Sequence, residues 1–391
     1  MRVAFTLIGG KDWTGGYNYL LNLLHVLGRH QMDRLIPVLF VGEACTEGDI
    51  APFAAIPGVE LVRTPLLNAS RRTGSLIQAM LLGRDISLQR LFQAHRINVV
   101  FESAQFFGWR LGIPAIAWIP DFQHKALPHL FSRSAWWKRE IGFRAQVMGG
   151  RTIMLSSEDA RRACEQHYPS TRGRTRTVHF AVPPGSRIPY SEARAAADSY
   201  GLPEHYFFMP NQFWRHKNHG LVLDALMILR ERGRQIVVAA SGKQVDPRAP
   251  DYFAIFQGRL EQGGLQNEFR LLGMIPYPHL ASLMRASTAM LNPSLFEGWS
   301  TTVEEAKAMG TPMLLSDLDV HREQMGAEAI YFDRHSALSL ADALDAFVPL
   351  SEMQRELRVD AVRDAALQRV ERFAQDFVDL VGHCQRVSGR P

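Results

Sequence analysis

The chain contains 391 residues, of which 46% are hydrophobic and 21% charged, and its formal net charge at pH 7 is +5. This length exceeds that of an ordinary single core, so two domains are expected, and the composition excludes an intrinsically disordered protein. Three scattered cysteines exclude a disulfide framework and a zinc site of the CxxC type, which fits a reducing compartment.

The first half of the chain alternates short β-rich runs with longer helical patterns. Its N-terminal run, MRVAFTLIGG, indicates a strand and not a signal peptide, because it has neither a small-residue cleavage site nor a long apolar span. The predicted strands are Val3–Ile8, Ile36–Val41, Val59–Val62, Ile97–Phe101, Ala115–Ile119, Thr152–Leu155 and Thr177–Phe180. The predicted helices are Tyr17–Gly28, Leu76–Ala94, Trp136–Met148 and Glu158–Tyr168.

A break follows at residues 181–190, AVPPGSRIPY, whose prolines and glycine indicate a linker. After a short helix, the alternation restarts with predicted strands at Tyr206–Met209, Ile236–Ala240, Phe269–Leu272, Ala289–Leu291, Met313–Leu315 and Ala329–Phe332. The helices predicted between and after them are Asn218–Glu231, Asp251–Glu261, Pro278–Arg285, Thr302–Met309, Ala337–Ala346 and the final 352–386 region.

This alternation is typical of parallel sheets with helical crossovers. We therefore expect an α/β protein with two doubly wound, Rossmann-like domains, residues 1–182 and 183–370, facing each other across a cleft. Residues 371–391 should form a helix that packs back towards the first domain. Sheets of this kind bind ligands at the carboxyl ends of their strands, so the cleft is the expected functional site.

Positive charge is concentrated between His124 and Arg176, where eleven Lys or Arg residues stand against four acidic ones. Such a surface attracts phosphates or acidic lipid head groups, although an arginine-rich, solvated face explains it equally well. Within this stretch, Trp136-Trp137-Lys138-Arg139 resembles a segment that lies at a membrane surface, and a buried helix face with two solvated charges is the alternative.

The segment at residues 292–306, NPSLFEGWSTTVEEA, follows a predicted strand and opens a predicted helix. Glu297 falls on the loop and Glu305 about one turn into the helix, so both carboxylates can face one crevice. Backbone N–H groups at the helix N-terminus are left open to an anion by small residues, namely Gly298, Ser300, Thr301 and Thr302. A diphosphate site flanked by two carboxylates that accept hydrogen bonds from hydroxyls suits a nucleotide sugar.

Helix capping is the structural alternative for the same acids. Thr302-x-x-Glu305 has the pattern of a capping box, as does Thr301-x-x-Glu304 in another register. Capping accounts for Glu305 without any ligand, but it leaves Glu297 and the neighbouring Trp299 unexplained.

Together with Lys307-Ala308-Met309-Gly310-Thr311-Pro312, this segment resembles the E-x7-E motif of the retaining glycosyltransferases of family 4, the group 1 glycosyltransferases, which have the GT-B fold. The resemblance implies that Glu297 contacts donor-sugar hydroxyls and that Glu305 holds the ribose hydroxyls. Main-chain N–H groups of Thr301 and Thr302 would bind the diphosphate. Here Ser300-Thr301-Thr302 replaces the family's Gly-Leu-Pro.

A basic motif, PNQFWRHKNH, follows the strand at Tyr206–Met209. A departing nucleoside diphosphate gains negative charge, which Lys217 and Arg215 can stabilise. By resemblance, Lys217-Asn218 matches the Lys-Gly of the family, and Asn211-Gln212 replaces its Gly-Arg, so Arg215 is expected to take over the missing arginine's role. We expect His216 and His219 to be ordinary surface histidines, since no third metal ligand lies at a useful spacing.

Other candidates rest on the resemblance. It implies that Gly15 and Gly16 close over the donor diphosphate and that His124, with Asp121 as the alternative, lies beside the donor sugar. Backbone groups of Met274 or Ile275 would read the nucleobase. Two further residues near a strand end, Glu102 and Arg110, are plausible acceptor contacts.

No metal or other cofactor is expected. Asp317-Leu318-Asp319 resembles the D-x-D metal motif of the other main glycosyltransferase fold, but its position after a late strand favours a turn with helix capping. The family manages the charge of the leaving group without a metal.

The expected activity is transfer of a hexose from a nucleoside diphosphate sugar to a glycan or lipid-linked acceptor, with retention at the anomeric carbon. Family habit favours GDP-mannose and bacterial surface-polysaccharide synthesis, with UDP- or dTDP-sugars as alternatives. A sugar-nucleotide epimerase or glycan phosphorylase of the same fold, or a catalytically silent binding protein, stays open. We expect a cytoplasmic protein, free or on the inner face of the plasma membrane, that binds no nucleic acid.

Overall fold

The structure is a computed structural model that describes residues 1–7, 14–31, 33–103 and 105–388. Contacts divide the chain into two compact units. The first comprises residues 1–122, 133–181 and 369–391, and the second comprises residues 123–132 and 182–368. Residues 123–132 therefore belong to the second unit by their contacts, although the expected first domain included them.

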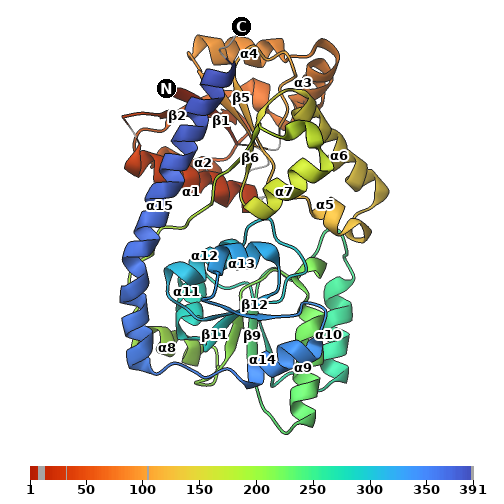
Figure 1. Cartoon of the computed structure of the whole chain (residues 1–391), viewed down its shortest axis with the longest axis vertical. Helices are drawn as coiled ribbons and strands as arrows, with labels where there is room; N and C mark the ends of the chain where they lie inside the picture. Colours follow the sequence, from red (N-terminus) through yellow and green to blue (C-terminus); the bar gives the residue numbers. More distant parts are fainter. Residues whose placement is uncertain (8–13, 32, 104, 389–391) are drawn as a thin grey trace. The chain divides into compact units, whose positions relative to one another are not determined.

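The first unit contains a seven-stranded parallel sheet with the strand order β3-β2-β1-β4-β5-β6-β7 (Figure 1). The strands are β1 (Arg2–Thr6), β2 (Ile36–Gly42), β3 (Glu60–Thr64), β4 (Val99–Ser103), β5 (Ala115–Trp118), β6 (Thr152–Leu155) and β7 (Thr175–Thr177). The longer helices are α1 (Thr14–His30), α2 (Glu47–Ala54), α3 (Ala69–Leu82), α4 (Ile86–Ala94), α6 (Arg133–Met148) and α7 (Glu158–His167).

The second unit repeats this arrangement with a six-stranded parallel sheet, ordered β10-β9-β8-β11-β12-β13. Its strands are β8 (Phe207–Met209), β9 (Val238–Ser241), β10 (Phe269–Gly273), β11 (Ala289–Asn292), β12 (Met313–Ser316) and β13 (Ile330–Phe332). Its helices are α8 (Tyr190–Ser199), α9 (His219–Glu231), α10 (Tyr252–Gln262), α11 (Tyr277–Ala286), α12 (Thr301–Ala308), α13 (Asp319–Met325) and α14 (Ala337–Asp345). Short α5 (Gln123–Ala126) joins this unit by its contacts.

Helices cover both faces of the second sheet. Phe207 and Met209 face a core with α9, α10 and α14, whereas Phe208 between them faces a core with α8, α11 and α12. Burial on both faces is why strands such as β8 read as continuous apolar runs in the sequence. All thirteen strands were predicted; β7 begins two residues before its predicted start, and β4 and β9 begin two residues after theirs.

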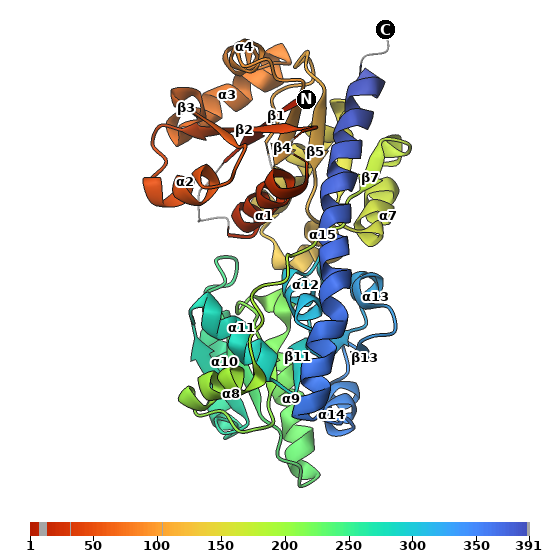
Figure 2. The ribbon, with the colours of Figure 1, turned by 90° about the vertical axis from the view of Figure 1, so that its left-hand side faces the viewer.

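The last helix, α15 (Glu352–Ser388), contributes residues to both units (Figure 2). In the first unit its aromatic residues pack against the sheet and α1: the ring of Phe377 lies 5.9 Å from Phe5, and that of Phe373 lies 6.3 Å from Tyr19. Among the described residues, no helix has both the length and the apolarity needed to cross a lipid bilayer.

One predicted helix is wrong. The Leu76–Ala94 pattern forms two helices, because Gly83 adopts a left-handed φ of 72° and ends α3, and Asp85 caps α4 by accepting the Leu88 N–H at 3.0 Å. Ile8, the last residue of the first predicted strand, lies outside the described residues.

Candidate active site

Two loops of the second unit meet where its strand order reverses. Strands β8 and β11 are neighbours at the centre of the sheet, and the helical crossovers after them run in opposite directions. Open parallel sheets bind ligands at such a switch point, beyond the carboxyl ends of the strands. Residues 211–217 follow β8 and residues 293–300 follow β11, so the sequence motifs lie at this position.

Lys217 and Glu297 join the two loops. The Lys217 ammonium donates to Glu297 Oε1 at 2.6 Å, and the two side chains are only 14% and 9% exposed. Lys217 ends the short 3-10 helix η5 (Arg215–Lys217), and the backbone of Leu295 in the other loop donates to the carbonyl of His216 at 2.8 Å. The sequence predicted both residues for the site, and the structure brings them into contact.

Several neighbours hold Glu297 in its ionised form. Ser294 lies 2.7 Å from the same carboxylate oxygen, and the amide of Asn292 donates to it at 3.5 Å. Burial by itself raises the pKa of Glu297, but Lys217, with smaller contributions from His321 and His216, outweighs burial and lowers this pKa to about 2. Glu297 is therefore an acceptor of hydrogen bonds near pH 7, not a proton donor.

The histidines of the basic motif are buried, so the expectation of surface histidines is wrong. His216 and His219 are 5% and 0% exposed, and burial lowers the pKa of each to about 3. His219 stacks on Phe213 with ring centroids 4.1 Å apart, and a ring nitrogen of His216 lies 3.2 Å from Arg248. Both imidazoles are thus neutral parts of the loop's support.

Sequence reasoning missed His321, a fully buried residue of α13 near Glu297. Its Nδ1 lies 2.9 Å from the Ser316 carbonyl, while its Nε2 has no hydrogen-bond partner among the described residues. Its local sequence pattern gives no sign that α13 carries it towards Glu297.

The first turn of α12 presents backbone N–H groups, as expected, but not through a capping box. The helix begins at Thr301 with Ser300 as its N-cap, and Ser300 makes no side-chain capping hydrogen bond. Ser300 is held by Gln324, which accepts its N–H at 3.2 Å and donates to its carbonyl at 3.1 Å. The N–H groups at the start of a helix lack intrahelical acceptors, so those of Thr301 and Thr302 can bind an anion.

The two glutamates of α12 differ in their surroundings. Glu304 is buried and accepts a hydrogen bond from Gln324 at 3.0 Å, whereas Glu305 receives one from the Tyr277 hydroxyl at 3.4 Å. Burial raises the pKa of Glu305 to about 7, against the opposing effect of the Tyr277 hydrogen bond. Because Ser300 is the N-cap of α12, the capping boxes at Thr301 and Thr302, which were the structural alternative for these acids, do not form.

Asn211 and Arg215 complete the loop after β8. The side-chain oxygen of Asn211 is buried and has no hydrogen-bond partner among the described residues, so it is an available acceptor. The Arg215 backbone N–H donates to Asp246 at 3.1 Å, and its side chain lines a hollow with Arg248. Arg215 is thus only two residues from Lys217, but its side chain lines this hollow and does not join the Lys217–Glu297 pair.

Three other predicted residues of this unit lie outside the two loops that carry Lys217 and Glu297. Met274 is 73% exposed just beyond β10, and Ile275 packs against one of the two cores. His124 is completely buried in α5, with its ring 6.4 Å from that of Phe131. Reading of the nucleobase by the backbone of Met274 or Ile275 and contact of His124 with the donor sugar both stay predictions.

Candidates in the first unit have mostly structural surroundings. Gly15 and Gly16 lie in the first turn of α1, where an added Cβ at Gly15 would meet nothing within 4 Å. Asp121 pairs with Arg139 at 2.9 Å, and Glu102 forms a buried ion pair with Arg151 at 3.0 Å. Glu102 therefore supports the core of the first unit, and its contact with an acceptor stays a prediction.

The D-x-D-like segment is a structural feature. Asp317 accepts from the Arg334 side chain at 2.8 Å, and α13 begins at Asp319. The described residues contain no group of three or more His, Cys, Asp or Glu side chains placed to share a metal ion.

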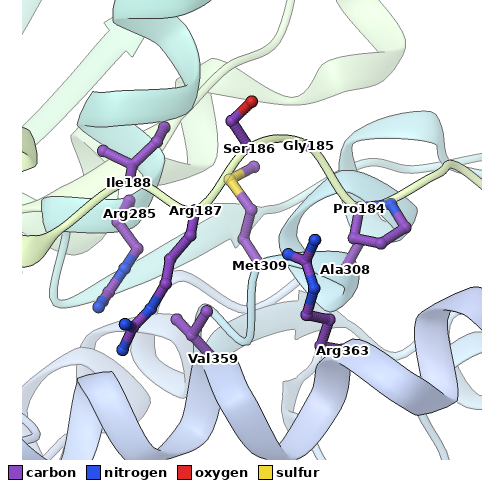
Figure 3. A pocket seen from close by; sticks show the side chains of 10 residues that line it. All are labelled: Pro184, Gly185, Ser186, Arg187, Ile188, Arg285, Ala308, Met309, Val359 and Arg363. Atoms are coloured by element: carbon purple, nitrogen blue, oxygen red, sulfur yellow. The ribbon is translucent and has the colours of Figure 1, made fainter.

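A second hollow of this unit lies among the linker, α11, α12 and α15 (Figure 3). Three arginines line it, but Arg187 and Arg285 both pair with Glu356, at 3.0 and 2.8 Å. None of the predicted site residues lines this hollow, so the switch-point loops are the stronger candidate site.

Comparisons with known proteins address the family and the fold of the chain. Residues 196–363 match the family model for glycosyl transferases group 1. None of the curated proteins matches the chain significantly.

Solved structures show the fold. The chain is similar to Anabaena Alr3699/HepE in complex with UDP, with 15% identity, a TM-score of 0.71, and 98% of this chain and 100% of that chain covered. A glycosyltransferase from Rickettsia africae ESF-5 has 13% identity and a TM-score of 0.67 over 98% and 97% of the two chains. Sucrose-phosphate synthase from Thermosynechococcus elongatus has 16% identity and a TM-score of 0.67 over 94% and 97%. The chain has the GT-B fold of two Rossmann-like domains.

Proposed function

We propose that the chain transfers a hexose from a nucleoside diphosphate sugar, because residues 196–363 match the family model for glycosyl transferases group 1 and the chain has the GT-B fold. The proposal adds retention at the anomeric carbon and a reaction that needs no metal ion. The observation that carries it is the buried Lys217–Glu297 pair, which lies at the switch point of the second sheet beside the free N–H groups of α12.

The donor's diphosphate is proposed to bind between Lys217 and the first turn of α12. Breaking the sugar–phosphate bond adds negative charge to the leaving diphosphate. A fixed ammonium and oriented N–H groups stabilise this charge most strongly in a partly buried site, where water screens them little. Lys217 is fixed by Glu297 and is mostly buried, so it can act without first losing a full hydration shell.

Glu297 is proposed to accept hydrogen bonds from hydroxyls of the donor sugar. Its pKa of about 2 keeps it ionised, which suits an acceptor and excludes a general acid at neutral pH. Glu305, half-buried beside Tyr277, is proposed to accept from the ribose hydroxyls. No second carboxylate among the described residues contacts Glu297. The leaving diphosphate itself is therefore the proposed base for the acceptor hydroxyl, and attack on the same face of the sugar gives retention.

A panel of donors is needed to identify the nucleobase and the sugar. The Anabaena structure holds UDP, and a second structure of that protein holds UDP and glucose, which makes UDP-glucose the first donor to test. GDP-mannose, the donor favoured from the sequence, and dTDP-sugars follow. The proposed acceptor is a glycan or lipid-linked hydroxyl in surface-polysaccharide synthesis, reached from the cytoplasmic membrane surface.

A thermal-shift panel with UDP, GDP, dTDP and ADP tests nucleotide binding. A ligand at 100 times its Kd stabilises the folded protein by about 2.7 kcal/mol, so the matching nucleotide should stand apart. Failure of all four would favour a catalytically silent relative. Product analysis with and without an acceptor then separates a transferase from an epimerase or a phosphorylase.

Metal removal tests the proposed independence from a divalent ion. Lys217 and the α12 N-terminus supply positive charge for the diphosphate, so dialysis against EDTA should leave the transfer rate within about twofold, a change of under 0.5 kcal/mol in barrier. A loss of activity that Mg²⁺ or Mn²⁺ restores would contradict this part of the proposal.

A further inference from the structure

A hollow beside the candidate donor site is lined by two arginines, Arg215 and Arg248, and by His129. Its lining includes His129, Phe131, Ser132, Arg215, Asp246 and Arg248, all from the second unit. Its space, open mouth included, is about 550 Å³, which is enough for a sugar-sized group. We propose that this hollow binds an anionic group, a phosphate or a carboxylate, of the acceptor; the inference rests on the proposed transferase function.

The only acid in the lining is already satisfied by protein donors. Asp246 is 2% exposed and accepts the backbone N–H groups of Arg215 at 3.1 Å and Arg248 at 3.0 Å. The side chain of Arg248 comes no closer to it than 3.5 Å. Arg215, which is exposed, forms no ion pair with any described residue. The lining therefore carries an excess of positive charge.

The shortest contacts of the Arg248 side chain are with neutral groups. Its guanidinium donates to Gln123 Oε1 at 2.6 Å, and it lies 3.2 Å from His216 Nδ1. It also lies 5.2 Å from the Phe131 ring centroid and 5.8 Å from that of Trp214. Its one acidic neighbour, Asp246, is 3.5 Å away and already accepts two backbone N–H groups, so the guanidinium keeps positive charge and remaining donors for a carboxylate or phosphate.

The hollow adjoins the donor site through one short element. Arg215 and Lys217 begin and end η5, and His216 between them contacts Arg248 with its ring and the Glu297 loop with its carbonyl. The contacts thus run from Arg248 through His216 to Lys217 and Glu297. An acceptor anchored by its anion in the hollow would have its hydroxyls beside the donor sugar, and the donor's own diphosphate is already provided for by Lys217 and α12.

Titration calorimetry on the full chain, saturated with the nucleotide that the panel identifies, tests this assignment. The probes are glucose 6-phosphate, glucuronate and glucose. We expect both anionic probes to bind at least tenfold more tightly than glucose. Arg248→Gln and Arg215→Gln should each lower the affinity for the anionic probes at least tenfold and leave the affinity for glucose unchanged. Arg259→Gln, which removes a surface arginine paired with Asp224, is the matched control and should change none of them.

Three results would overturn the inference. Equal affinity for glucose and the anionic probes, or unchanged anion binding in both variants, would show that the hollow is not an anion site. Weaker nucleotide binding in Arg248→Gln, with the anionic probes unaffected, would assign the arginines to the donor. Nucleotide binding by the unmodified chain is measured first, because its absence would overturn the proposed function itself. Thermal unfolding of each variant confirms that the fold is retained.

Discussion

Lys217 and Glu297 come from loops 80 residues apart, and neither charge is well solvated without the other. A carboxylate kept ionised by a fixed ammonium can bind sugar hydroxyls in every catalytic cycle without changing its protonation state. The pair also keeps Lys217 extended into the site. In this account the two residues position each other before they act on a donor.

Glu297→Gln keeps the size of the side chain and removes its charge. Because sugar hydroxyls would then face a weaker acceptor, kcat/KM for the donor should fall at least 100-fold, a loss of about 2.7 kcal/mol in transition-state stabilisation. Steady-state assays measure the fall, and Glu261→Gln on the exposed side of α10 serves as the control. Full activity in Glu297→Gln would remove Glu297 from the mechanism.

Lys217→Gln should weaken binding of the diphosphate part of the donor and not of its nucleoside part. We expect the affinity for the matching nucleoside diphosphate to fall about tenfold or more, since a charge-assisted contact contributes about 1.5–3 kcal/mol. Affinity for the parent nucleoside should stay within twofold. An equal loss for both ligands, measured by calorimetry, would indicate a general disturbance of the loop.

Glu305 gives a prediction about pH. Its pKa is raised from 4.5 to about 7, so the folded chain holds this proton more tightly than the unfolded chain. Stability should therefore decline as the pH rises from about 4.5 to about 7, with the full cost present above pH 7. Glu305→Gln avoids the cost and should raise Tm by about 2–4 °C at pH 8 while leaving it nearly unchanged at pH 5. Equal shifts at both pH values would contradict the burial of an ionising Glu305.

At the scale of elements, Gly242 sets the path of the loop after β8. It follows β9 with a φ of 144°, and an added Cβ would lie 2.7 Å from the Asn211 carbonyl oxygen and 2.9 Å from the Gln212 Cα. Both contacts are with backbone, so no side chain can move aside. The loop that carries Lys217 can take its observed course only beside a glycine.

Gly242→Ala should thus weaken nucleotide binding as well as stability. The unfavourable φ and the clash together should cost about 2 kcal/mol or more. Gly233→Ala, with a φ of 72° and nothing within 4 Å of the added Cβ, isolates the backbone cost at about 1 kcal/mol. Urea unfolding measures both changes, and only Gly242→Ala should also lower nucleotide affinity. Identical behaviour of the two variants would mean that the close approach has no influence on the site.

The elements that the sequence predicted well are those with strong, continuous signals. Buried parallel strands such as β8 and β11 are short apolar runs, and each was found. Helix α2 was missed because Gly48 and Pro52 interrupt its pattern, although Thr46 caps it by accepting the Asp49 N–H. The break between α3 and α4 depends on one left-handed glycine, Gly83, inside an otherwise helical pattern.

Site prediction had a different limit. Glu297 and Lys217 were identified from motifs, but no local pattern could show that they touch. His219 is buried by a cluster with Phe213 from the same loop and with Phe256, which is distant in sequence. Ser300 as N-cap depends on Gln324 from α13, so the capping boxes read from the sequence were the wrong local solution.

At the scale of the whole molecule, the two units share one architecture but differ in the motifs that they carry. Both units have the strand order of a doubly wound sheet, but the motifs that match the group 1 family lie in the second unit. In the first unit, much of the basic 124–176 stretch is engaged internally: Arg151 pairs with Glu102, Arg139 with Asp121, and Arg161 with Glu158. The overall charge of this stretch is thus a poor guide to an anion-binding surface. Trp137 in the same stretch is 56% exposed.

Turnover of nucleotide sugars by the full chain and by Glu297→Gln is the most direct measurement of the central claim. We predict that the unmodified chain releases the nucleoside diphosphate from one donor of a panel containing UDP-glucose, GDP-mannose and dTDP-glucose. The product should retain the anomeric configuration of the donor by NMR. Glu297→Gln should still be stabilised by the same nucleotide but should turn the donor over at least 100 times more slowly. Equal turnover by both proteins, or binding of no nucleotide by the unmodified chain, would contradict a donor site built on Lys217 and Glu297.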